Sequence, residues 1–448
     1  MDNKLSKAVL VGIAGSNNAF SLSIYNLKAF AYNDPEIRDQ WDISIIQHPL
    51  INVNRRDIEV LPLIDRIVNA KPGLIGFSCY MWNVNVFDEI AQVLRKRIPK
   101  AKIIWGGSEM SSDYLMQGKF DKLEMDFCVS GEGEVTFQEF LRNQAFGVPD
   151  LSNIPGLAYR QSTSEPFKIN PKREALEILH DVPSPFLTGV VDDEVLLRPK
   201  VEANIETQRG CNLRCSYCTY HKDMDKITYS SLERVVSEVV YLVNKGVKRV
   251  RFVDANFSSD LNYSKEILRA FIQKRFKLRL MFELIPGFID EELATLFEEF
   301  SNLHPWNDIT LGVGVQSIKL ETNKAMRRGI KIEKFDQTFE LIKKHNLFAK
   351  IDLIIGLPGE NLVDIEASLE YMMETVRFGQ GHLLCFHVLR GLPGTELLEI
   401  AQKSKMTFSS EHEPHVFVES PDLPRKDMLK CLRRTAVVFR LTNHRGWA

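Results

Sequence analysis

No sign of charge predominates in this chain of 448 residues, which has 57 lysines and arginines against 59 aspartates and glutamates. Without a net basic field, neither a nucleic acid nor an anionic membrane is expected as the main partner. Long apolar runs are also missing, since Ala8 to Ala14 and Leu353 to Leu357 fall far short of the roughly 20 residues that a membrane span needs. Met1 to Lys7 lacks a secretory layout, so we expect a cytoplasmic protein without a membrane span.

Cysteine is scarce, and its spacing is more informative than its number. Four of the seven cysteines are scattered, at Cys79, Cys128, Cys385 and Cys431. The other three stand together as Cys211, Cys215 and Cys218. The odd count and a cytoplasmic setting disfavour disulfides. The clustered trio is therefore the first candidate for a chemical site.

The first third of the chain alternates short β-branched runs with amphipathic helical stretches. Strands are expected at 8–12, 43–47, 73–78, 103–105 and 127–129, with helices at 21–32, 58–69, 86–97 and 135–142. Strands separated by helices of this length predict right-handed crossovers and a parallel, doubly wound, Rossmann-like sheet. Such sheets bind ligands at the carboxyl ends of their strands, where this chain has several small and polar residues.

A second alternation follows a stretch rich in proline. The prolines between about 149 and 200 predict an extended connector. Strands are then expected at 203–206, 249–253, 279–284, 310–315, 350–355 and 383–388, with helices between them. These units are too few for an eight-fold barrel, so a partial (β/α)6 barrel is the better interpretation. The expected domains are 1–148 and 201–398, joined by a connector at 149–200 and followed by a C-terminal helical segment at 399–448.

The C-terminal segment contains one amphipathic pattern. After Pro424, a helix is expected to bury Met428, Leu432, Ala436 and Phe439 along one face. Its basic residues form either a solvated face, which is the more common case, or a site for an anionic substrate or partner.

The cysteine trio lies directly after the first strand of the second alternation, on the loop where an α/β barrel places its active site. A zinc site would normally need a fourth Cys or His nearby, and the next candidate is His221. An iron–sulfur cubane held by three thiolates instead leaves one iron open for a substrate or cofactor. We favour the cluster over zinc.

The segment from Glu206 to Cys218 resembles the signature of the radical S-adenosylmethionine (SAM) enzymes. In that family the amino and carboxylate groups of SAM chelate the open iron of a [4Fe-4S] cluster, and one electron cleaves SAM to a 5′-deoxyadenosyl radical. The resemblance implies cluster ligation by Cys211, Cys215 and Cys218. It also implies that Tyr217 lies near the adenine, and that an external one-electron reductant of the flavodoxin or ferredoxin type is a partner.

Further motifs of the second domain resemble the SAM-binding segments of the same family. The resemblance implies contacts to SAM from Asp254 and Asn256, from Gln316, Ser317 and Arg328, and from Ile354, Gly356 and Leu357. Glu283, a carboxylate on the third strand, could bond a ribose hydroxyl. Asp352 departs from the pattern, because glycine is usual there. Taken alone, Gly356 and Arg328 could equally be an ordinary turn glycine and a surface residue.

The first domain resembles the cobalamin-binding domain of the cobalamin-dependent radical SAM branch. The resemblance implies a corrin contacted by residues at the carboxyl ends of the strands: Ser16, Ser78, Cys79, Gly106, Gly107, Ser108, Gly131 and Glu132. The Asp-x-His-x-x-Gly motif that supplies an axial histidine in many cobalamin proteins is absent, and His48 lacks its partners. The bulky Tyr80, Met81 and Trp82 could fill the corrin space, or could be half-buried core residues.

The preferred interpretation is a cobalamin-dependent methyltransferase acting on an unactivated carbon of a small molecule or peptide. Two alternatives remain open: a radical SAM dehydratase, epimerase or cyclase with the same fold, and a non-catalytic protein that keeps the cluster for stability. Methylthiotransfer is disfavoured, because a second cluster would need three cysteines in the first domain and only Cys79 and Cys128 are there.

Overall fold

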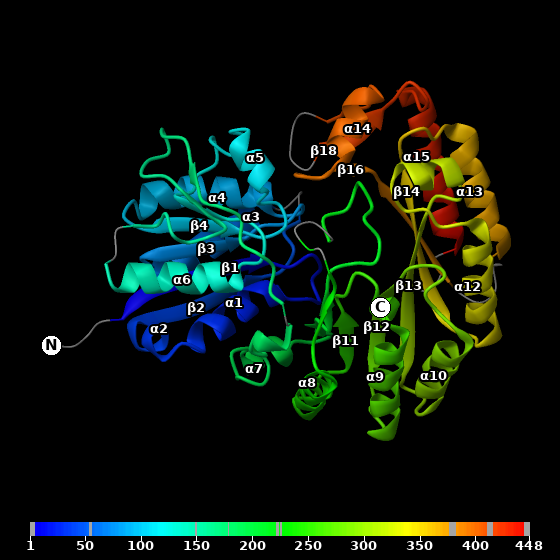
Figure 1. Ribbon diagram of the computed structural model, residues 1–448, viewed down its shortest axis with the longest axis horizontal. Helices are drawn as coiled ribbons and strands as arrows, with labels where there is room; N and C mark the ends of the chain where they lie inside the picture. Colours follow the sequence, from blue (N-terminus) through cyan, green and yellow to red (C-terminus); the bar gives the residue numbers. More distant parts are fainter. Residues whose placement is uncertain are drawn as a thin grey trace. The chain divides into compact units, whose positions relative to one another are not determined.

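The computed structural model describes residues 5–442, with gaps at 53–55, 148–149, 178, 221–223, 225, 376–381 and 410–414. The chain forms two compact units, residues 1–204 with 237–247 and residues 205–236 with 248–448. The expected fold class is confirmed. A mostly parallel sheet is followed by a six-stranded parallel sheet of the partial-barrel type and by a C-terminal helix (Figure 1).

The sheet of the first unit has the strand order β2-β1-β3-β4-β5-β6-β7. Its strands are β1 (Ser6–Ile13), β2 (Trp41–His48), β3 (Leu74–Ser78), β4 (Lys102–Gly106), β5 (Phe127–Val129), β6 (Leu157–Tyr159) and β7 (Lys168–Ile169). The first five strands pair in parallel. Strand β3 is buried along its whole length, as expected of a parallel strand covered on both faces.

Helices cover both faces of this sheet (Figure 1). The helices of this unit are α1 (Leu22–Tyr32), α2 (Pro35–Gln40), α3 (Arg56–Ala70), α4 (Val84–Arg97), α5 (Ser112–Met116), α6 (Glu134–Ala145) and α7 (Asp193–Leu196), with a 3-10 turn at Leu179–Asp181. Helices α1, α2 and α6 pack on one another, and α3 packs on α4. Helix α4 buries Phe87, Ile90 and Leu94 at the spacing of one helix face.

The proline-rich stretch contributes to this sheet. Within the segment expected to be an extended connector, β6 pairs antiparallel with β5 and β7 pairs antiparallel with β6. Prolines do not interrupt these strands, which are only three and two residues long.

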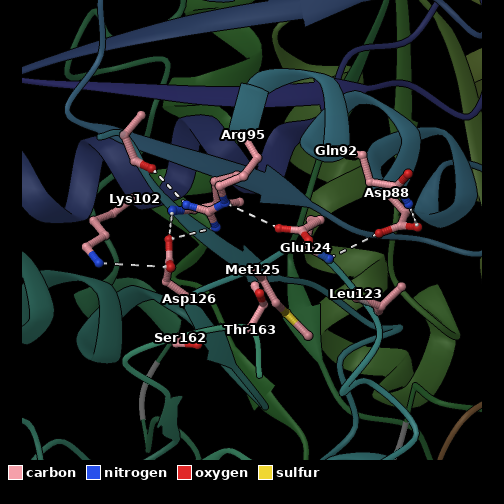
Figure 2. A network of polar contacts seen from close by, with 12 residues as sticks. Asp88, Gln92, Arg95, Lys102, Leu123, Glu124, Met125, Asp126, Ser162 and Thr163 are labelled. Carbon is pink, nitrogen blue, oxygen red and sulfur yellow. Dashed lines mark hydrogen bonds and ion pairs between the residues drawn. The ribbon is translucent and has the colours of Figure 1, made fainter. Parts of the chain in front are cut away.

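A buried carboxylate joins β4 and β5 at the ends of the strands opposite to the predicted ligand edge (Figure 2). Asp126 Oδ2 accepts hydrogen bonds from the backbone N–H of Ile103 at 2.8 Å and from Arg95 Nη2 at 3.2 Å. Arg95 also donates to Glu124 at 3.3 Å. The network therefore anchors α4 and the segment before β5 to the sheet.

Replacing Asp126 with alanine is expected to lower the free energy of unfolding by about 2 to 3 kcal/mol, because a buried N–H and a largely buried guanidinium lose their acceptor. Asp65→Ala is the matched control. It removes an exposed ion pair with Arg97, which is worth less than about 1 kcal/mol. Urea denaturation of both variants measures the difference. Equal stability of the two variants would contradict the role given to Asp126.

The second sheet has the strand order β15-β14-β13-β12-β11-β8. Its strands are β8 (Glu202–Ile205), β11 (Arg249–Phe252), β12 (Arg279–Leu284), β13 (Asp308–Gln316), β14 (Phe348–Ile355) and β15 (Leu383–Val388). A short hairpin, β9 (Gln208–Arg209) with β10 (Thr228–Tyr229), brackets the cysteine loop. All six strands lie at the positions expected from the sequence, within a few residues.

The helices of the second alternation form an arc outside these strands (Figure 1). They are α8 (Leu232–Asn244), α9 (Leu261–Gln273), α10 (Glu291–Asn302), α11 (Leu320–Ala325), α12 (Ile332–Lys344) and α13 (Leu362–Thr375), with a 3-10 turn at Phe257–Ser259. Phe252, Phe257, Phe282 and Phe297 pack together and are fully buried. These rings are the core between the sheet and its helices.

The C-terminal segment contains α14 (Leu397–Lys403), the short strands β16 (Arg390–Gly391), β17 (Thr407–Phe408) and β18 (His415–Glu419), and α15 (Arg425–Thr442). Helix α15 buries Met428, Cys431, Thr435 and Val438. The expected face was wrong, because Leu432 and Phe439 are exposed. The small side chains of Cys431 and Thr435 lie on the packed side of the helix instead.

Within the described ranges, no helix combines the length and the apolar composition that crossing a membrane requires.

Candidate active site

The three clustered cysteines lie on the loop between β9 and β10, and each sulfur has a hydrogen-bond donor nearby. The backbone N–H of Leu213 points to Cys211 Sγ at 3.5 Å, and that of Tyr220 to Cys218 Sγ at 3.5 Å. Arg328 Nη1 lies 3.7 Å from Cys215 Sγ. Burial raises the pKa of Cys211, and raises that of Cys218 to about 11. The loop thus holds thiols that must lose protons to bind metal, with donors that favour the thiolates.

Arg328 is a buried cation that joins the cysteine loop to β13. Its Nη2 donates to the carbonyl of Gly314, and its Nη1 lies 3.4 Å from the hydroxyl of Tyr217. Although burial alone would lower it, the neighbouring Tyr217 and Cys215 hold the pKa of Arg328 above its ordinary value. The guanidinium therefore stays charged beside the cysteines. The sequence left a surface position open for Arg328, and the structure shows that the residue is buried.

The segment before Arg328 also contacts the cysteine loop. No sequence motif predicts this contact. The backbone N–H of Ser216 donates to the carbonyl of Met326 at 3.0 Å, and the Ser216 hydroxyl lies 3.3 Å from Met326 Sδ. Ser216 and Met326 are buried. Two segments that are distant in the sequence, 215–217 and 326–328, thus meet around one guanidinium.

The end of β13 is irregular where Gln316 and Ser317 lie. The register with β14 shifts between Gly314 and Gln316, and Gln316 has a φ of 66°. Ser317 donates a hydrogen bond to Glu360, whose pKa burial raises to about 8. Glu360 is therefore protonated at neutral pH. The hydroxyl of Ser317 is used inside the protein, whereas Gln316 Oε1 is buried without a hydrogen-bond partner among the described residues.

Asp254 holds the backbone that leads into the cysteine loop, and Asn256 contacts Asn212 within the loop. Asp254 accepts hydrogen bonds from the N–H and hydroxyl of Thr207 at 2.8 and 2.6 Å and from the N–H of Gln208 at 3.0 Å. Asn256 Nδ2 lies 3.2 Å from Asn212 Oδ1, and its Oδ1 accepts from the N–H of Ile285 at 3.1 Å. Both side chains are buried, and their hydrogen bonds fix the position of the loop.

The remaining residues expected at SAM lie at the ends of β12 and β14. Glu283 on β12 is ion-paired with Arg251 at 2.8 Å. On β14 and the turn after it, Ile354 is half-buried and Leu357 is buried. A Cβ at Gly356 would lie 2.3 Å from the ring of Phe417, so packing against β18 already requires glycine there.

In the first unit, the residues expected at a corrin gather at one edge of the sheet. Ser16 follows β1, Ser78 ends β3, Gly106 ends β4 and Gly131 follows β5. These strands are adjacent and parallel, so their carboxyl ends meet. Ser16 and Ser108 are exposed. Ser78 shares a hydrogen bond with Ser23 at 2.8 Å, Cys79 is buried, and Glu132 accepts from the N–H of Leu176 at 2.6 Å.

An aromatic pair lies at the same edge. The rings of Tyr80 and Trp82 are stacked with centroids 4.6 Å apart, and Trp82 Nε1 donates to the carbonyl of Ile13 at 2.9 Å. Trp82 is nevertheless 42% exposed. Tyr80 is half-buried, so the pair lies partly at the surface of this edge.

Comparison with known proteins identifies the two units. Residues 205–372 match the model of the radical SAM superfamily, and residues 38–141 match the model of the B12-binding domain. The chain carries a B12-binding domain followed by a radical SAM domain. Together the two domains imply a [4Fe-4S] cluster, SAM and cobalamin as cofactors.

Two curated relatives are similar to this chain over most of its length. The chain is 27% identical over 78% of its length to the cobalamin-dependent radical SAM methyltransferase TokK of Streptomyces tokunonensis, of which the match covers 50%. It is 24% identical over 89% of its length to the 2-(S-pantetheinyl)-carbapenam-3-carboxylate methyltransferase of Streptantibioticus cattleyicolor, covering 57% of that protein. The chain thus spans about half the length of these relatives.

The fold is also that of a solved structure, the radical SAM methyltransferase TsrM from Kitasatospora setae with cobalamin and a [4Fe-4S] cluster bound. The TM-score is 0.68 at 20% identity, over 91% of this chain and 76% of TsrM.

The residues of the radical SAM domain fit an anionic cluster with a ligand beside it. Arg328 Nε and Gln316 Oε1 are buried and lack hydrogen-bond partners within the described part of the chain. A buried donor and a buried acceptor left open are costly unless a bound group satisfies them. No three His, Cys, Asp or Glu side chains among the described residues are arranged around a single metal ion. His221, the possible fourth zinc ligand, lies outside the described residues.

The edge of the B12-binding domain fits a ligand that approaches the backbone closely. Gly131 has a φ of 83°, and a Cβ built on it would meet no atom within 4 Å. The open backbone at Gly131 and the exposed hydroxyls of Ser16 and Ser108 leave room at the carboxyl ends of β1, β4 and β5. Gly107 is different, because its φ is 113° and a Cβ there would lie 2.4 Å from the carbonyl oxygen of Cys79.

Gly107→Ala is expected to lower the free energy of unfolding by more than about 3 kcal/mol, because strain at positive φ adds to a backbone clash. Gly131→Ala shares the positive φ but has open space, so about 1 to 2 kcal/mol is expected. Chemical denaturation of the two variants gives the comparison. If Gly107→Ala loses no more stability than Gly131→Ala, the turn at Gly107 relaxes around the added Cβ and the clash is not costly.

Proposed function

We propose that this protein is a cobalamin-dependent radical SAM methyltransferase that methylates an unactivated carbon of a small molecule or peptide. The observation that carries the proposal is the charged Arg328 guanidinium against Cys215 Sγ, with its own Nε and the nearby Gln316 Oε1 buried and without hydrogen-bond partners among the described residues. The B12-binding domain in the same chain and the methyltransferase names of TokK and the carbapenam enzyme support the choice among radical SAM reactions.

The proposal gives each part of the radical SAM domain a task. Cys211, Cys215 and Cys218 hold the cluster, and Arg328 balances the charge beside it. Gln316 and the ends of β12 and β14 line the place for SAM. When bound, the cluster and SAM supply a carbon-centred radical, and cobalamin supplies the methyl group. Burial of Cys215 and of Arg328 limits the access of water to this chemistry.

The B12-binding domain has a simpler task in the proposal. Residues 1–148 hold the corrin at the carboxyl ends of β1, β3, β4 and β5, through Ser16, Ser78, Cys79, Gly106, Gly107, Ser108, Gly131 and Glu132. Residues 149–200 add β6 and β7 to the sheet of this domain and lead to the barrel at 201–398, and residues 399–448 follow the barrel. An external one-electron reductant of the flavodoxin or ferredoxin type is the expected protein partner.

Cobalamin binding tests the proposal directly. The anaerobically purified chain with its cluster reconstituted is mixed with hydroxocobalamin and passed through a desalting column. We expect about one cobalamin per chain in the ultraviolet–visible spectrum. Gly131→Phe should lose most of it, because the ring fills the open edge. Gly147→Phe is the matched control, since Gly147 also has a positive φ and open space but follows α6.

A protein that holds a full cluster and retains no cobalamin would contradict the proposal. Retention by Gly131→Phe at the wild-type level would instead place the corrin elsewhere on the first domain.

A further inference from the structure

The face of the second sheet that is turned away from the helices carries charged side chains. On β11 and β12, the buried Phe252 and Phe282 alternate with Arg251 and Glu283. On β14, Ile351 and Leu353 are buried on the helix side, and Lys350 and Asp352 lie on the other face. None of these charges belongs to the cysteine loop. The inner face of the partial barrel is therefore polar in its own right.

Glycines on the middle strand bring these charges together. Gly312 on β13 is paired with Glu283 on one side and Lys350 on the other, and Gly314 is paired with Asp352. A Cβ at Gly312 would lie 2.2 Å from Glu283 Oε2, so the carboxylate of Glu283 lies across the strand. Strand β13 therefore presents no side chain at these two inward positions, where the carboxylate of Glu283 lies over Gly312 and the side chains of Gln316 and Arg328 lie close to Gly314.

Asp352 is the centre of this group. Lys350 Nζ lies 2.8 and 2.7 Å from its two carboxylate oxygens, and His387 Nε2 on β15 lies 2.8 Å from Oδ1. Although burial alone would raise it, the hydrogen bond from His387 and the charge of Lys350 hold the pKa of Asp352 below its ordinary value. The carboxylate is ionised and can only accept hydrogen bonds. The proton in its bond with His387 is consequently on Nε2.

The other ring nitrogen of His387 is open. A ring whose one proton is on Nε2 carries a lone pair on Nδ1, which accepts hydrogen bonds. The described residues offer Nδ1 no partner, and 56% of the His387 side chain is exposed. Cys385, two residues earlier on the same face, is paired in register with Asp352 and does not bond to the ring. A histidine fixed by a buried carboxylate and open on its far side is arranged to receive a ligand.

We propose that His387, oriented by Asp352, is a substrate-recognition residue that accepts a hydrogen bond at Nδ1 from an N–H or O–H group of the substrate. The proposal rests on the proposed function, because it places the substrate on the inner face of the barrel. The expected substrate is therefore a molecule with an N–H or O–H group near the carbon that reacts. Asp352 is a positioning residue, since it acts through the ring of His387.

Two substitutions of His387 separate recognition from structure. His387→Gln places an amide nitrogen where Nε2 was, so the hydrogen bond to Asp352 is kept and the acceptor at Nδ1 is lost. His387→Asn places an amide oxygen where Nδ1 was, so the acceptor is kept and the link to Asp352 is lost. A purely structural histidine predicts lower thermal stability for His387→Asn and unchanged ligand binding in both variants.

The probes are two matched pairs of small molecules, indole with N-methylindole and phenol with anisole, which differ in a single donor. Ligand-observed NMR measures their binding to the full chain loaded with cluster and SAM. We expect indole and phenol to bind the wild type about tenfold more tightly than their methylated partners, and His387→Gln to lose that preference. His387→Asn should keep most of it.

Equal binding of the two members of each pair, or a preference that survives in His387→Gln, would overturn the assignment of His387. The measurement needs no turnover. A chain that does not methylate can therefore still show the binding preference that His387 predicts. The assignment of His387 and the proposed function are thus tested separately.

Discussion

Replacing Cys215 with alanine is expected to abolish both cluster loading and SAM cleavage while leaving the fold intact. A cubane with three protein ligands has no spare thiolate, and Cys215 is the ligand whose sulfur contacts Arg328. Iron content should fall from about four per chain to less than one, and formation of 5′-deoxyadenosine should fall at least about a thousandfold. Iron analysis and chromatography of the products under dithionite measure both.

The matched control is Cys431→Ala. Cys431 is also buried, but it lies on α15 and packs away from the cysteine loop. This variant should lose about 1 kcal/mol of stability and keep its iron and its SAM cleavage. If Cys215→Ala retains SAM cleavage, the site assignment is wrong, whatever the fold.

Replacing Arg328 with methionine is the second large effect that we expect. Methionine keeps much of the volume and removes the charge that Tyr217 and Cys215 hold in place. The carbonyl of Gly314 loses its donor as well. Losing a buried, charged hydrogen-bonding partner costs about 3 kcal/mol, which corresponds to about a hundredfold in the rate of SAM cleavage.

The neighbouring residue supplies the control for Arg328. Arg327 is 60% exposed in its side chain and pairs with Glu396 at the surface. Arg327→Met should therefore change SAM cleavage less than about twofold. If both variants lose a comparable part of the rate of SAM cleavage, that rate depends on the total charge of the segment. It then does not depend on the contact between the Arg328 guanidinium and Cys215.

Much of the fold follows from the alternation of strand and helix patterns. The expected strand 43–47 lies inside β2, and 310–315 lies inside β13. Short elements were not predictable in this way. Helix α2 has six residues and β7 has two, so neither is long enough for its hydrophobic pattern to repeat several times. Their place is set by neighbours distant in the sequence.

The parts of the site that depend on spacing within one loop were visible in the sequence, and those that depend on register were not. The cysteine spacing alone marked Cys215, but its contact with Arg328 spans 113 residues. Similarly, Asp352 stood out only as a departure from glycine. Its partner His387 is 35 residues away in the sequence, and no sequence motif marks it. Only the pairing of β14 with β15 brings the two together.

The fate of the SAM methyl group tests the account most directly. The reduced chain of 448 residues, with cluster and cobalamin loaded, is incubated with SAM that carries a deuterated methyl group. We expect 5′-deoxyadenosine from the radical SAM domain, together with S-adenosylhomocysteine in at least the molar amount of bound cobalamin. Formation of 5′-deoxyadenosine with no S-adenosylhomocysteine would contradict a methyltransferase and would favour a radical SAM enzyme that does not methylate.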